Sequence, residues 1–275
     1  MTSIVLAVHN EEKNLKLCLD SDVIRAIADE IIVVDGESTD KTKEVAEKFG
    51  AKVITTTNKA NFHINKQMAI DCAKGDLILQ LDADEVIDEE LGSFIFTLNQ
   101  KIVDYKKTHS DFIENWKKHN PVAWSIARKN LFLNTWLKKG GQFPDPVIRL
   151  FIKGQARLPQ KDVHEQLEVN GQVGEADGFL WHYSNPDFST YLRKFNTYTS
   201  FKAEQLSAAN TKVTLFNSFK HLIILPFTTF LSLFVRHKGF VDGVAGFVFA
   251  LFSGLHHTIA YIKLWEIYQN QKRMK

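Results

Sequence analysis

Two aspartates that follow a strongly apolar segment are the residues of this chain best suited to chemistry. The segment Leu77–Leu81 is typical of a buried parallel strand, and Asp82 and Asp84 come directly after it. Residues two apart in extended backbone point to the same face, so both carboxylates are expected on one side, at the carboxyl end of the strand. Open α/β sheets bind ligands at that end, and hard oxygen ligands suit a divalent cation that carries a diphosphate. The alternative is an ordinary acidic turn.

Polar clusters also follow two earlier predicted strands. The apolar residues 3–8 lead into residues 9–12, and the apolar residues 30–34 lead into residues 35–40. Helix N-caps explain some of these side chains, because Asp and Asn are favoured there. Three such clusters at the carboxyl ends of neighbouring parallel strands nevertheless converge in space, so we expect them to share a ligand.

The elements that must position these clusters alternate between strand and helix. This alternation indicates βαβ units and a mostly parallel sheet flanked by helices. No G-x-G-x-x-G follows the first strand and no G-x-x-x-x-G-K-[ST] occurs, which argues against a dinucleotide Rossmann site and a P-loop. The expected strands are 3–8, 30–34, 52–55, 76–81, 122–131, 147–152 and 179–183; the expected helices are 14–20, 41–49, 65–73, 89–118 and most of the chain after 188, with breaks at Pro226 and near Gly239.

Composition narrows the class of protein. The chain has 275 residues, of which 44% are hydrophobic, and its formal net charge of +2 argues against a general nucleic-acid binder. Its two cysteines, Cys18 and Cys72, make neither a disulfide framework nor a zinc site and fit a reducing compartment. Nothing before residue 4 resembles a signal peptide, so none is expected.

The C-terminal part differs in charge and composition. From residue 205 to residue 275 there are eight Lys and Arg against two Asp and Glu, together with nine of the 21 Phe. Two apolar runs, 222–235 and 240–255, are shorter than the roughly 20 residues that span a bilayer, and cations flank them. We expect residues 205–275 to be a membrane-surface segment behind a catalytic domain of residues 1–204. Helices buried against that domain and a spanning hairpin are the alternatives.

Several motifs together resemble the family 2 glycosyltransferases, which have the Rossmann-like GT-A fold. The matches are residues 7–12 (Ala-Val-His-Asn-Glu-Glu), residues 33–40 (Val-Val-Asp-Gly-Glu-Ser-Thr-Asp) and the D-x-D at residues 82–84. Residues 65–69 resemble the helix with a basic residue that precedes the D-x-D. The similarity is greatest to the bacterial lipopolysaccharide-core β-glucosyltransferase type, which has similar Asp-Ala-Asp-Glu, Val-His-Glu and His-Tyr-Ser patterns.

The resemblance implies a role for each matching residue. Asp35 would hydrogen-bond the base of a nucleotide-sugar donor, with a UDP-sugar expected. Lys66 would reach the diphosphate. Asp84 would bind Mg²⁺ or Mn²⁺, and Asp82 would contact the ribose or a metal-bound water and is the second metal candidate. The base and ribose would also be lined by Ala7, His9, Asn10, Glu11 and Ala83, with His9 standing where many relatives have Tyr.

Inverting sugar transfer also needs a general base. Glu165 matches the family's acidic position and is the expected base, with the neighbouring His164 as an alternative and a helix- or strand-capping role as another. Arg149, on an apolar strand, needs an anion, which is either a structural carboxylate or a phosphate. Arg128 is a candidate for contact with a phosphorylated or acidic acceptor, although a solvated edge strand is the favoured explanation.

These inferences predict an inverting, metal-dependent hexosyltransferase. The acceptor would be a lipid-linked or cell-envelope glycan, such as a lipopolysaccharide core or a polyprenyl-phosphate-linked sugar. The enzyme would be peripheral or monotopic on the cytoplasmic face of the cell membrane. The alternatives are a non-catalytic membrane-associated nucleotide-sugar-binding protein and a sugar nucleotidyltransferase, although residues 9–12 stand where the latter class has a Gly-rich basic loop.

Overall fold

The chain forms two compact units in the computed structural model, which describes residues 1–59, 61–159 and 167–273. The first unit comprises Met1–Arg128 and Pro146–His182, and the second comprises Lys129–Asp145 and Tyr183–Lys275. The expected division after residue 204 falls inside helix α7 (Phe188–Ala208), all of which belongs to the second unit.

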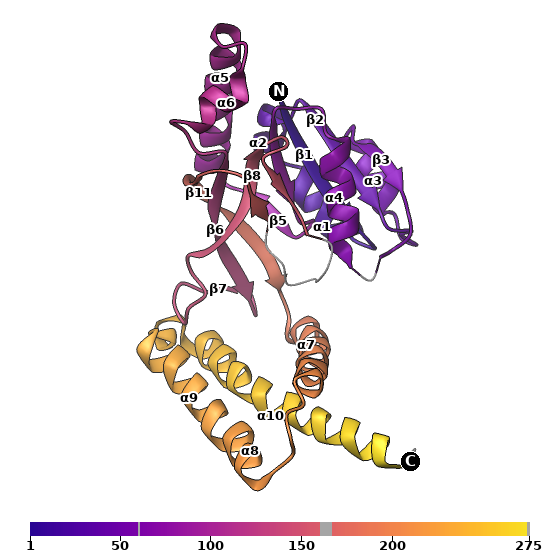
Figure 1. Ribbon diagram of the computed structural model, residues 1–275, viewed down its shortest axis with the longest axis vertical. Coiled ribbons are helices and arrows are strands. Elements are labelled where there is room, and N and C mark those ends of the chain that lie inside the picture. The colour runs from indigo at the N-terminus through magenta and orange to yellow at the C-terminus, as the bar shows by residue number, and fades with distance from the viewer. Residues whose placement is uncertain (60, 160–166, 274–275) are drawn as a thin grey trace. The chain divides into compact units, whose positions relative to one another are not determined.

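Four parallel strands form the first part of the sheet, in the order β3-β2-β1-β4 (Figure 1). The chain runs outward from β1 (Thr2–Val8) to β2 (Glu30–Asp35) and β3 (Lys52–Thr55), and then returns to place β4 (Leu77–Leu81) on the other side of β1. The strand order therefore reverses between β1 and β4. Ligands of open α/β sheets bind at the carboxyl ends of strands next to such a reversal.

The remainder of the sheet is not parallel. Strand β8 (Asp145–Ile152) pairs antiparallel with β4, and the short β5 (Glu85–Ile87) pairs antiparallel with β11 (Val173–Asn185) at the other edge. The fold is thus mixed α/β, with a parallel half that agrees with the sequence expectation. The sheet also contains β6 (Ala123–Phe132) and its partner β7 (Thr135–Trp136), and a separate ribbon is formed by β9 (Ala156–Arg157) and β10 (Glu168–Val169).

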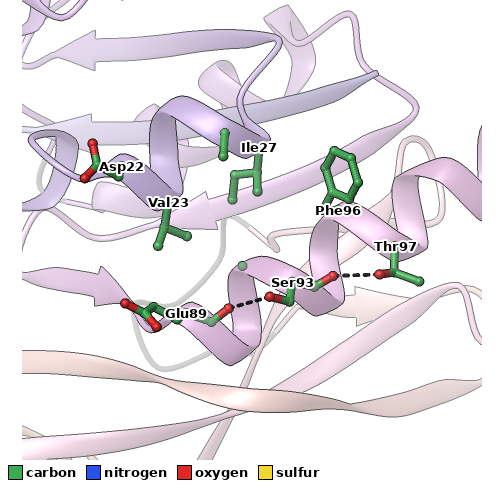
Figure 2. A pocket seen from close by; sticks show the side chains of 9 residues that line it. Asp22, Val23, Ile27, Glu89, Ser93, Phe96 and Thr97 are labelled. Atoms are coloured by element: carbon green, nitrogen blue, oxygen red, sulfur yellow. Dashed lines mark hydrogen bonds between the residues drawn. The ribbon is translucent and has the colours of Figure 1, made fainter.

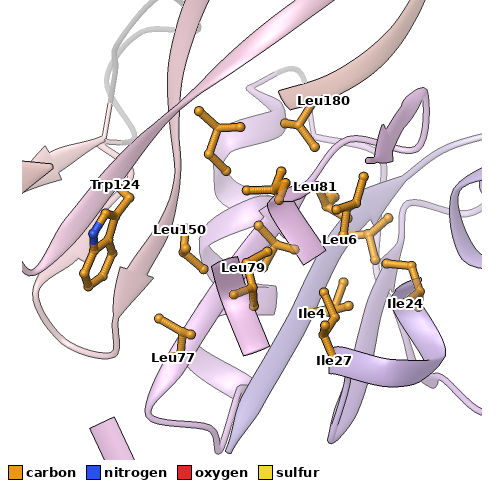
Figure 3. Close-up of a cluster of buried hydrophobic side chains, with 14 of the residues drawn as sticks. Ile4, Leu6, Ile24, Ile27, Leu77, Leu79, Leu81, Trp124, Leu150 and Leu180 are labelled. Carbon is orange, nitrogen blue, oxygen red and sulfur yellow. The ribbon is translucent and has the colours of Figure 1, made fainter. Parts of the chain in front are cut away.

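Successive side chains along each strand point to opposite faces of the sheet, so a hydrophobic core forms on each face. Ile4 and Leu6 pack on one face with side chains from α1 (Glu12–Leu19), α2 (Asp22–Ile27), α3 (Thr42–Lys48) and α5 (Glu89–Thr108), as Figure 3 shows for part of this cluster. Val5 points to the opposite face, which α4 (Phe62–Cys72) covers. β4 is buried along its whole length, so the residue that follows it has a fixed position.

Two expectations about helices were wrong. The polar stretch 89–118 forms two helices, because α5 ends at Thr108 and α6 (Phe112–Lys117) starts anew after Asp111. Pro226 does not break its helix. A π-helical turn, η1 (Lys220–Ile224), comes just before it, and the Leu225 N–H bonds the Lys220 carbonyl five residues back. The wider turn changes the hydrogen-bond pattern locally, so the missing proline donor is tolerated.

The second unit ends in a helical hairpin (Figure 1). Its first arm is one continuous helix, Leu215–Arg236, and its second arm is Gly239–Arg273; both are long and apolar enough to cross a membrane by length and composition. The first arm is therefore longer than the apolar run 222–235 suggested. It contains α8 (Leu215–Phe219), η1, α9 (Leu225–Leu231) and η2 (Ser232–Arg236), and the second arm contains η3 (Gly239–Asp242) and α10 (Gly243–Arg273).

Small residues allow the two arms to approach closely. Gly246, Ala250 and Gly254 recur every four residues along α10 and are buried. A Cβ atom built on Gly254 would lie 2.5 Å from the Pro226 carbonyl oxygen, so only glycine fits there. This small-xxx-small pattern is the one that packs helices tightly in membranes.

Candidate active site

The loops that follow β1 and β2 are hydrogen-bonded into a single structure. The Asn10 N–H donates to Ser38 Oγ at 2.9 Å, and the Thr39 N–H donates to Asn10 Oδ1 at 2.7 Å. The Glu12 N–H donates to Asp40 Oδ2 at 3.2 Å. Asn10 has φ of +56°, a left-handed conformation that Asn tolerates better than most residues. The first two polar clusters therefore form one edge, as the sequence predicts.

Three further predicted donor-site residues lie on this edge. His9 is exposed, and its Nδ1 lies 2.7 Å from the Gly36 carbonyl oxygen, which fixes the ring. Ala7 is partly buried near the end of β1. Glu11 accepts a hydrogen bond from Asn14 Nδ2 at 2.7 Å.

Asp35 presents a buried carboxylate oxygen at the end of β2. The side chain is 2% exposed, and its Oδ2 accepts the Ser38 N–H at 3.2 Å. Its Oδ1 is buried and has no hydrogen-bond partner among the residues that the structure describes. Leaving a buried acceptor unpaired costs about 1–3 kcal/mol. A ligand N–H group would remove that cost.

Asp82 lies between two cations. One carboxylate oxygen contacts Lys66 Nζ and the other contacts Arg149 Nη2. Burial opposes the charge of Asp82, but the positive charges of Arg149 and Lys66 outweigh it and hold the pKa of that carboxyl well below its usual range. Asp82 is therefore ionised at neutral pH, and Lys66, the predicted diphosphate contact, lies beside it.

Glu85 was not singled out from the sequence, yet it organises the same cluster. Its side chain is fully buried, 3.1 Å from Arg149 Nη2 and 3.4 Å from Arg128 Nη1, and its other oxygen accepts the Asp82 N–H at 2.9 Å. A buried carboxylate is tolerated only with such partners. Arg149 thus has structural carboxylate partners, the first of its two expected kinds of anion. The only sequence signal for Glu85 was its position directly after the D-x-D.

Asp84 faces His182, the histidine of the His-Tyr-Ser pattern in the sequence. His182 Nε2 lies 3.6 Å from Asp84 Oδ2, because β11 pairs with β5 in a register that sets His182 opposite Glu85. Ala83, between the two aspartates, is buried. Sequence spacing cannot reveal this pair, since about a hundred residues separate its members.

The Asp84–His182 pair fits a divalent cation. A carboxylate oxygen or an imidazole nitrogen lies about 2.0–2.2 Å from a bound Mg²⁺ or similar ion, so two ligands of one ion are at most about 4.2 Å apart. The observed 3.6 Å satisfies that limit. Residues 1–59, 61–159 and 167–273 contain no group of three or more His, Cys, Asp or Glu that would complete a protein-only site. Mg²⁺ commonly takes its remaining ligands from water and substrate phosphates.

A cavity of about 140 Å³ adjoins these cations. It is lined by Lys66 and Arg149 and by two leucines, Leu158 and Leu167. His164 and the predicted base Glu165 lie outside the described residues. The remaining lining residues are His63, Pro146, Val147 and Ile148.

A second cavity of the first unit offers little chemistry. It measures about 450 Å³ and lies between α2 and α5, where Val23, Ile27 and Phe96 point into it (Figure 2). The hydroxyls of Ser93 and Thr97 donate to carbonyls of their own helix, as the dashed lines in Figure 2 mark. None of the predicted site residues lines this cavity.

The chain is similar to several known proteins. An uncharacterized glycosyltransferase of Rickettsia typhi is 27% identical over 276 residues, which cover 96% of this chain and 87% of that protein. The lipopolysaccharide core biosynthesis glycosyltransferase LpsC of Rhizobium meliloti is 27% identical over 269 residues, with 94% and 89% covered. The crystal structure of S. aureus TarS 1–349 in complex with UDP-GlcNAc aligns with a TM-score of 0.43 and 17% identity, over 97% of this chain and 89% of that one. Residues 3–154, more than half of the chain, match the family model described as glycosyl transferase family 2. The chain therefore belongs to glycosyltransferase family 2.

Proposed function

We propose that this protein is an inverting, metal-dependent glycosyltransferase that moves a sugar from a UDP-sugar to a lipid-linked or cell-envelope glycan. The observation that carries the proposal is the Asp84–His182 pair. It lies beside Asp82 and its cationic partners Lys66 and Arg149, at the point where the strand order of the sheet reverses. A donor that consists of a base, a diphosphate and a sugar needs complementary groups in the same spatial order along one edge of the sheet.

In this proposal, the base binds at the joined loops after β1 and β2. Asp35 supplies its buried Oδ1 to an N–H of the base, while His9 packs against the nucleoside. Asn10 keeps the two loops together, so this half of the site is formed before the donor arrives. Such preorganisation lowers the entropic cost of binding.

The diphosphate would lie against the charged half of the site. Asp84 and His182 would hold Mg²⁺ or Mn²⁺. The bound ion would act as a Lewis acid that neutralises the diphosphate and so favours its departure. Lys66 and Arg149 line the adjoining cavity and bring positive charge to the phosphate oxygens. Glu85 fixes Arg149 and the Asp82 backbone, so it is a positioning residue.

Glu165 is the proposed base for the acceptor hydroxyl. Leu158 and Leu167, on either side of the 160–166 segment, line the same cavity as Lys66 and Arg149. The assignment of Glu165 rests on its match to the acidic position of the family. His164 remains the alternative base.

The second unit and the similarity to LpsC support the proposed acceptor and the proposed membrane location. LpsC has a lipopolysaccharide core function by name, and its similarity extends over most of this chain, including the helical hairpin. Exposed apolar side chains on the hairpin support attachment to a membrane. We therefore place the enzyme on the cytoplasmic face of the cell membrane, as a peripheral or monotopic protein.

A screen of nucleotide sugars tests the proposal. Each UDP-sugar is mixed with the full-length protein, with and without Mn²⁺ or Mg²⁺, and the melting temperature is recorded. A donor at a hundred times its Kd should raise the melting temperature by roughly 5–10 °C, and more with metal than without it. The matched control is Asp84→Ala, which should lose the metal-dependent part of the shift.

The same screen separates the alternatives. An enzyme releases UDP from the stabilising donor when an acceptor glycan is present, whereas a non-catalytic binder leaves the donor intact. If no nucleotide sugar changes the melting temperature under any metal condition, the proposed donor site is wrong. Formation of a nucleotide sugar from a sugar phosphate and a nucleoside triphosphate would instead identify a nucleotidyltransferase.

A further inference from the structure

The first arm of the hairpin exposes a row of large apolar side chains. Phe216, Phe219, Ile223, Phe227 and Val235 are all more than half exposed. These residues are three, four, four and eight positions apart. Four residues are slightly more than one turn of an α-helix and slightly less than one turn of the wider π-helix. The π-helical segments η1 and η2 therefore help to keep these side chains on one face of the helix.

Polar groups of the same arm point toward α10 instead. Ser218 Oγ lies 3.2 Å from Tyr261 Oη, and the ring of His221 stacks on Tyr261 with the ring centroids 4.8 Å apart. Thr229 Oγ1 lies 3.1 Å from His257 Nε2. A helix that turns several polar side chains inward and exposes large apolar ones is suited to an apolar medium.

Polar segments cover another side of α10 along most of its length. Near its C-terminal end, Lys263 Nζ donates to the Asn196 carbonyl and to Thr199 Oγ1 of α7. Helix α7 also exposes Arg193 and Glu204, which need water. A bilayer therefore cannot surround α10 at this end.

The other end of α10 is held by an irregular loop. The N–H groups of Lys138 and Lys139 donate to the Asp242 carboxylate at 2.9–3.1 Å, and the Gly140 N–H donates to the His237 carbonyl at 2.9 Å. Lipid-exposed irregular backbone does not occur in the hydrocarbon core, so this loop lies outside it.

Both covering segments start from the same pair of strands. The Leu133 N–H, just after β6, donates to the Asn185 carbonyl at the end of β11 at 2.9 Å. The loop at 137–145 continues from the β6–β7 side, and α7 continues from β11. Segments so closely joined stay on one side of a membrane, so the two ends of the hairpin do too.

Positive charge gathers where the loop meets the hairpin turn. Lys138, Lys139, Arg236 and Lys238 are all exposed, and Asp242 is occupied by the two loop N–H groups. Exposed Phe240 is next to this cluster in the chain. Cations beside exposed apolar side chains complement anionic lipid headgroups above an acyl layer.

We propose that the hairpin lies flat in one leaflet of an anionic membrane, and that Lys138 and Lys139 of the 137–145 loop bind lipid headgroups together with Arg236 and Lys238. This inference rests on the proposed membrane location and adds its orientation and its anchoring residues. Although each arm is long enough to span a bilayer, neither crosses it.

Single cysteines test the orientation in the full-length protein. With Cys18 and Cys72 replaced by serine, His237→Cys marks the turn and Gln271→Cys marks the far end of α10. Each variant is bound from outside to sealed vesicles of phosphatidylglycerol and phosphatidylethanolamine, and then treated with a membrane-impermeant maleimide. Both positions should react fully without detergent. If either position reacts only after detergent is added, the flat orientation is wrong.

A charge reversal tests the loop lysines. Lys138→Glu with Lys139→Glu should weaken binding to the same vesicles by at least about 30-fold at low salt. The control, Lys43→Glu with Lys48→Glu, makes the same change of net charge on exposed lysines of α3 and should bind nearly as the wild type does. The milder pair Lys138→Gln and Lys139→Gln, checked by its melting temperature, separates a headgroup effect from misfolding.

The possible results distinguish this inference from the proposed function. Equal vesicle binding by the loop variant and the control overturns the role of the loop lysines while leaving the membrane location intact. A wild-type protein that ignores anionic vesicles overturns both. Transfer to a soluble acceptor glycan is measured separately and reports only on the catalytic proposal.

Discussion

The strand-end site of the first unit and the hairpin of the second treat polar groups in opposite ways. In the first unit, apolar side chains fill both faces of the sheet, and the carboxylates of Asp82 and Glu85 are paired at its edge with the cations of Lys66, Arg128 and Arg149. In the hairpin, polar side chains such as Thr229 and His257 meet between the arms, whereas large apolar side chains such as Phe216 and Phe227 are exposed. This difference is the one expected if, as we propose, the first unit binds a polar ligand in water and the hairpin contacts lipid.

Removal of Asp84 should have the largest effect on the site. Asp84→Ala deletes one of the two proposed metal ligands, so transfer should fall by at least about 100-fold at saturating metal, with the fold retained. Initial rates of UDP release measure the loss. Asp177→Ala, at an exposed position of β11, is the control and should be fully active. Normal activity of Asp84→Ala would show that the proposed metal site at Asp84 and His182 is wrong.

Glu165→Gln should act on turnover alone. The amide keeps the size of the side chain but cannot accept the acceptor's proton, so kcat should fall by about 10²–10⁴-fold. Donor Kd, measured by calorimetry, should stay within a few-fold of the wild type. His164→Gln is the companion variant, and a larger drop in its kcat would make His164 the base. A change confined to donor affinity would place Glu165 among the donor contacts.

Asp82→Asn should weaken the first unit and change its response to acid. Breaking a buried ion pair at one partner costs about 3 kcal/mol, because Lys66 and Arg149 lose a compensating charge. Since the folded-state pKa of Asp82 is depressed, its contribution is fully present above about pH 5 and is lost as the pH falls toward that pKa. The free energy of unfolding, measured with urea, should therefore fall more steeply between pH 5 and pH 2 for the wild type than for Asp82→Asn.

The control for this titration is Asp177→Asn, which removes an exposed carboxylate. Its free energy of unfolding should follow the wild type at each pH. Parallel curves for wild type and Asp82→Asn would mean that Asp82 is not preferentially charged in the folded state.

Gly254→Val tests the packing of the two hairpin arms, and its expected effect on stability is smaller. The added side chain would meet the Pro226 carbonyl oxygen, so the arms must separate, at a cost of about 1–3 kcal/mol. The melting temperature of the hairpin-containing protein in detergent should fall, while the activity on a soluble acceptor should change little. Val244→Leu, at a position 79% exposed, adds bulk to the same helix without a clash and should leave the melting temperature unchanged.

The parallel half of the first unit could be predicted because its signals are local. Each strand is an apolar run that ends in polar residues, and the helix from Lys41 to Phe49 was expected within a residue or two of the observed α3. Strand β5 was missed because three residues, Glu85–Ile87, carry no periodic pattern. Likewise α2, with six residues, is too short for helical periodicity to appear.

The site was predicted only in its local parts for the same reason. The D-x-D spacing placed Asp82 and Asp84 together, but the ion pair of Asp82 with Lys66 depends on how α4 packs on the sheet. The partners Glu85 and His182 meet through an antiparallel pairing that no motif encodes. In the second unit, composition indicated a membrane surface, but the contact of Asp242 with the loop at Lys138 joins positions a hundred residues apart.

The buried Oδ1 of Asp35, which has no partner in the part of the chain that the structure describes, has a consequence for the lifetime of the protein in the cell. A buried acceptor without a partner makes the donor-free form less stable than its contacts would otherwise allow. If the donor binds as proposed, it would supply the missing hydrogen bond and shift the population away from the opened forms that proteases cut. Steady-state abundance is therefore expected to rise and fall with the supply of nucleotide sugar, so that scarcity of substrate would itself deplete the enzyme.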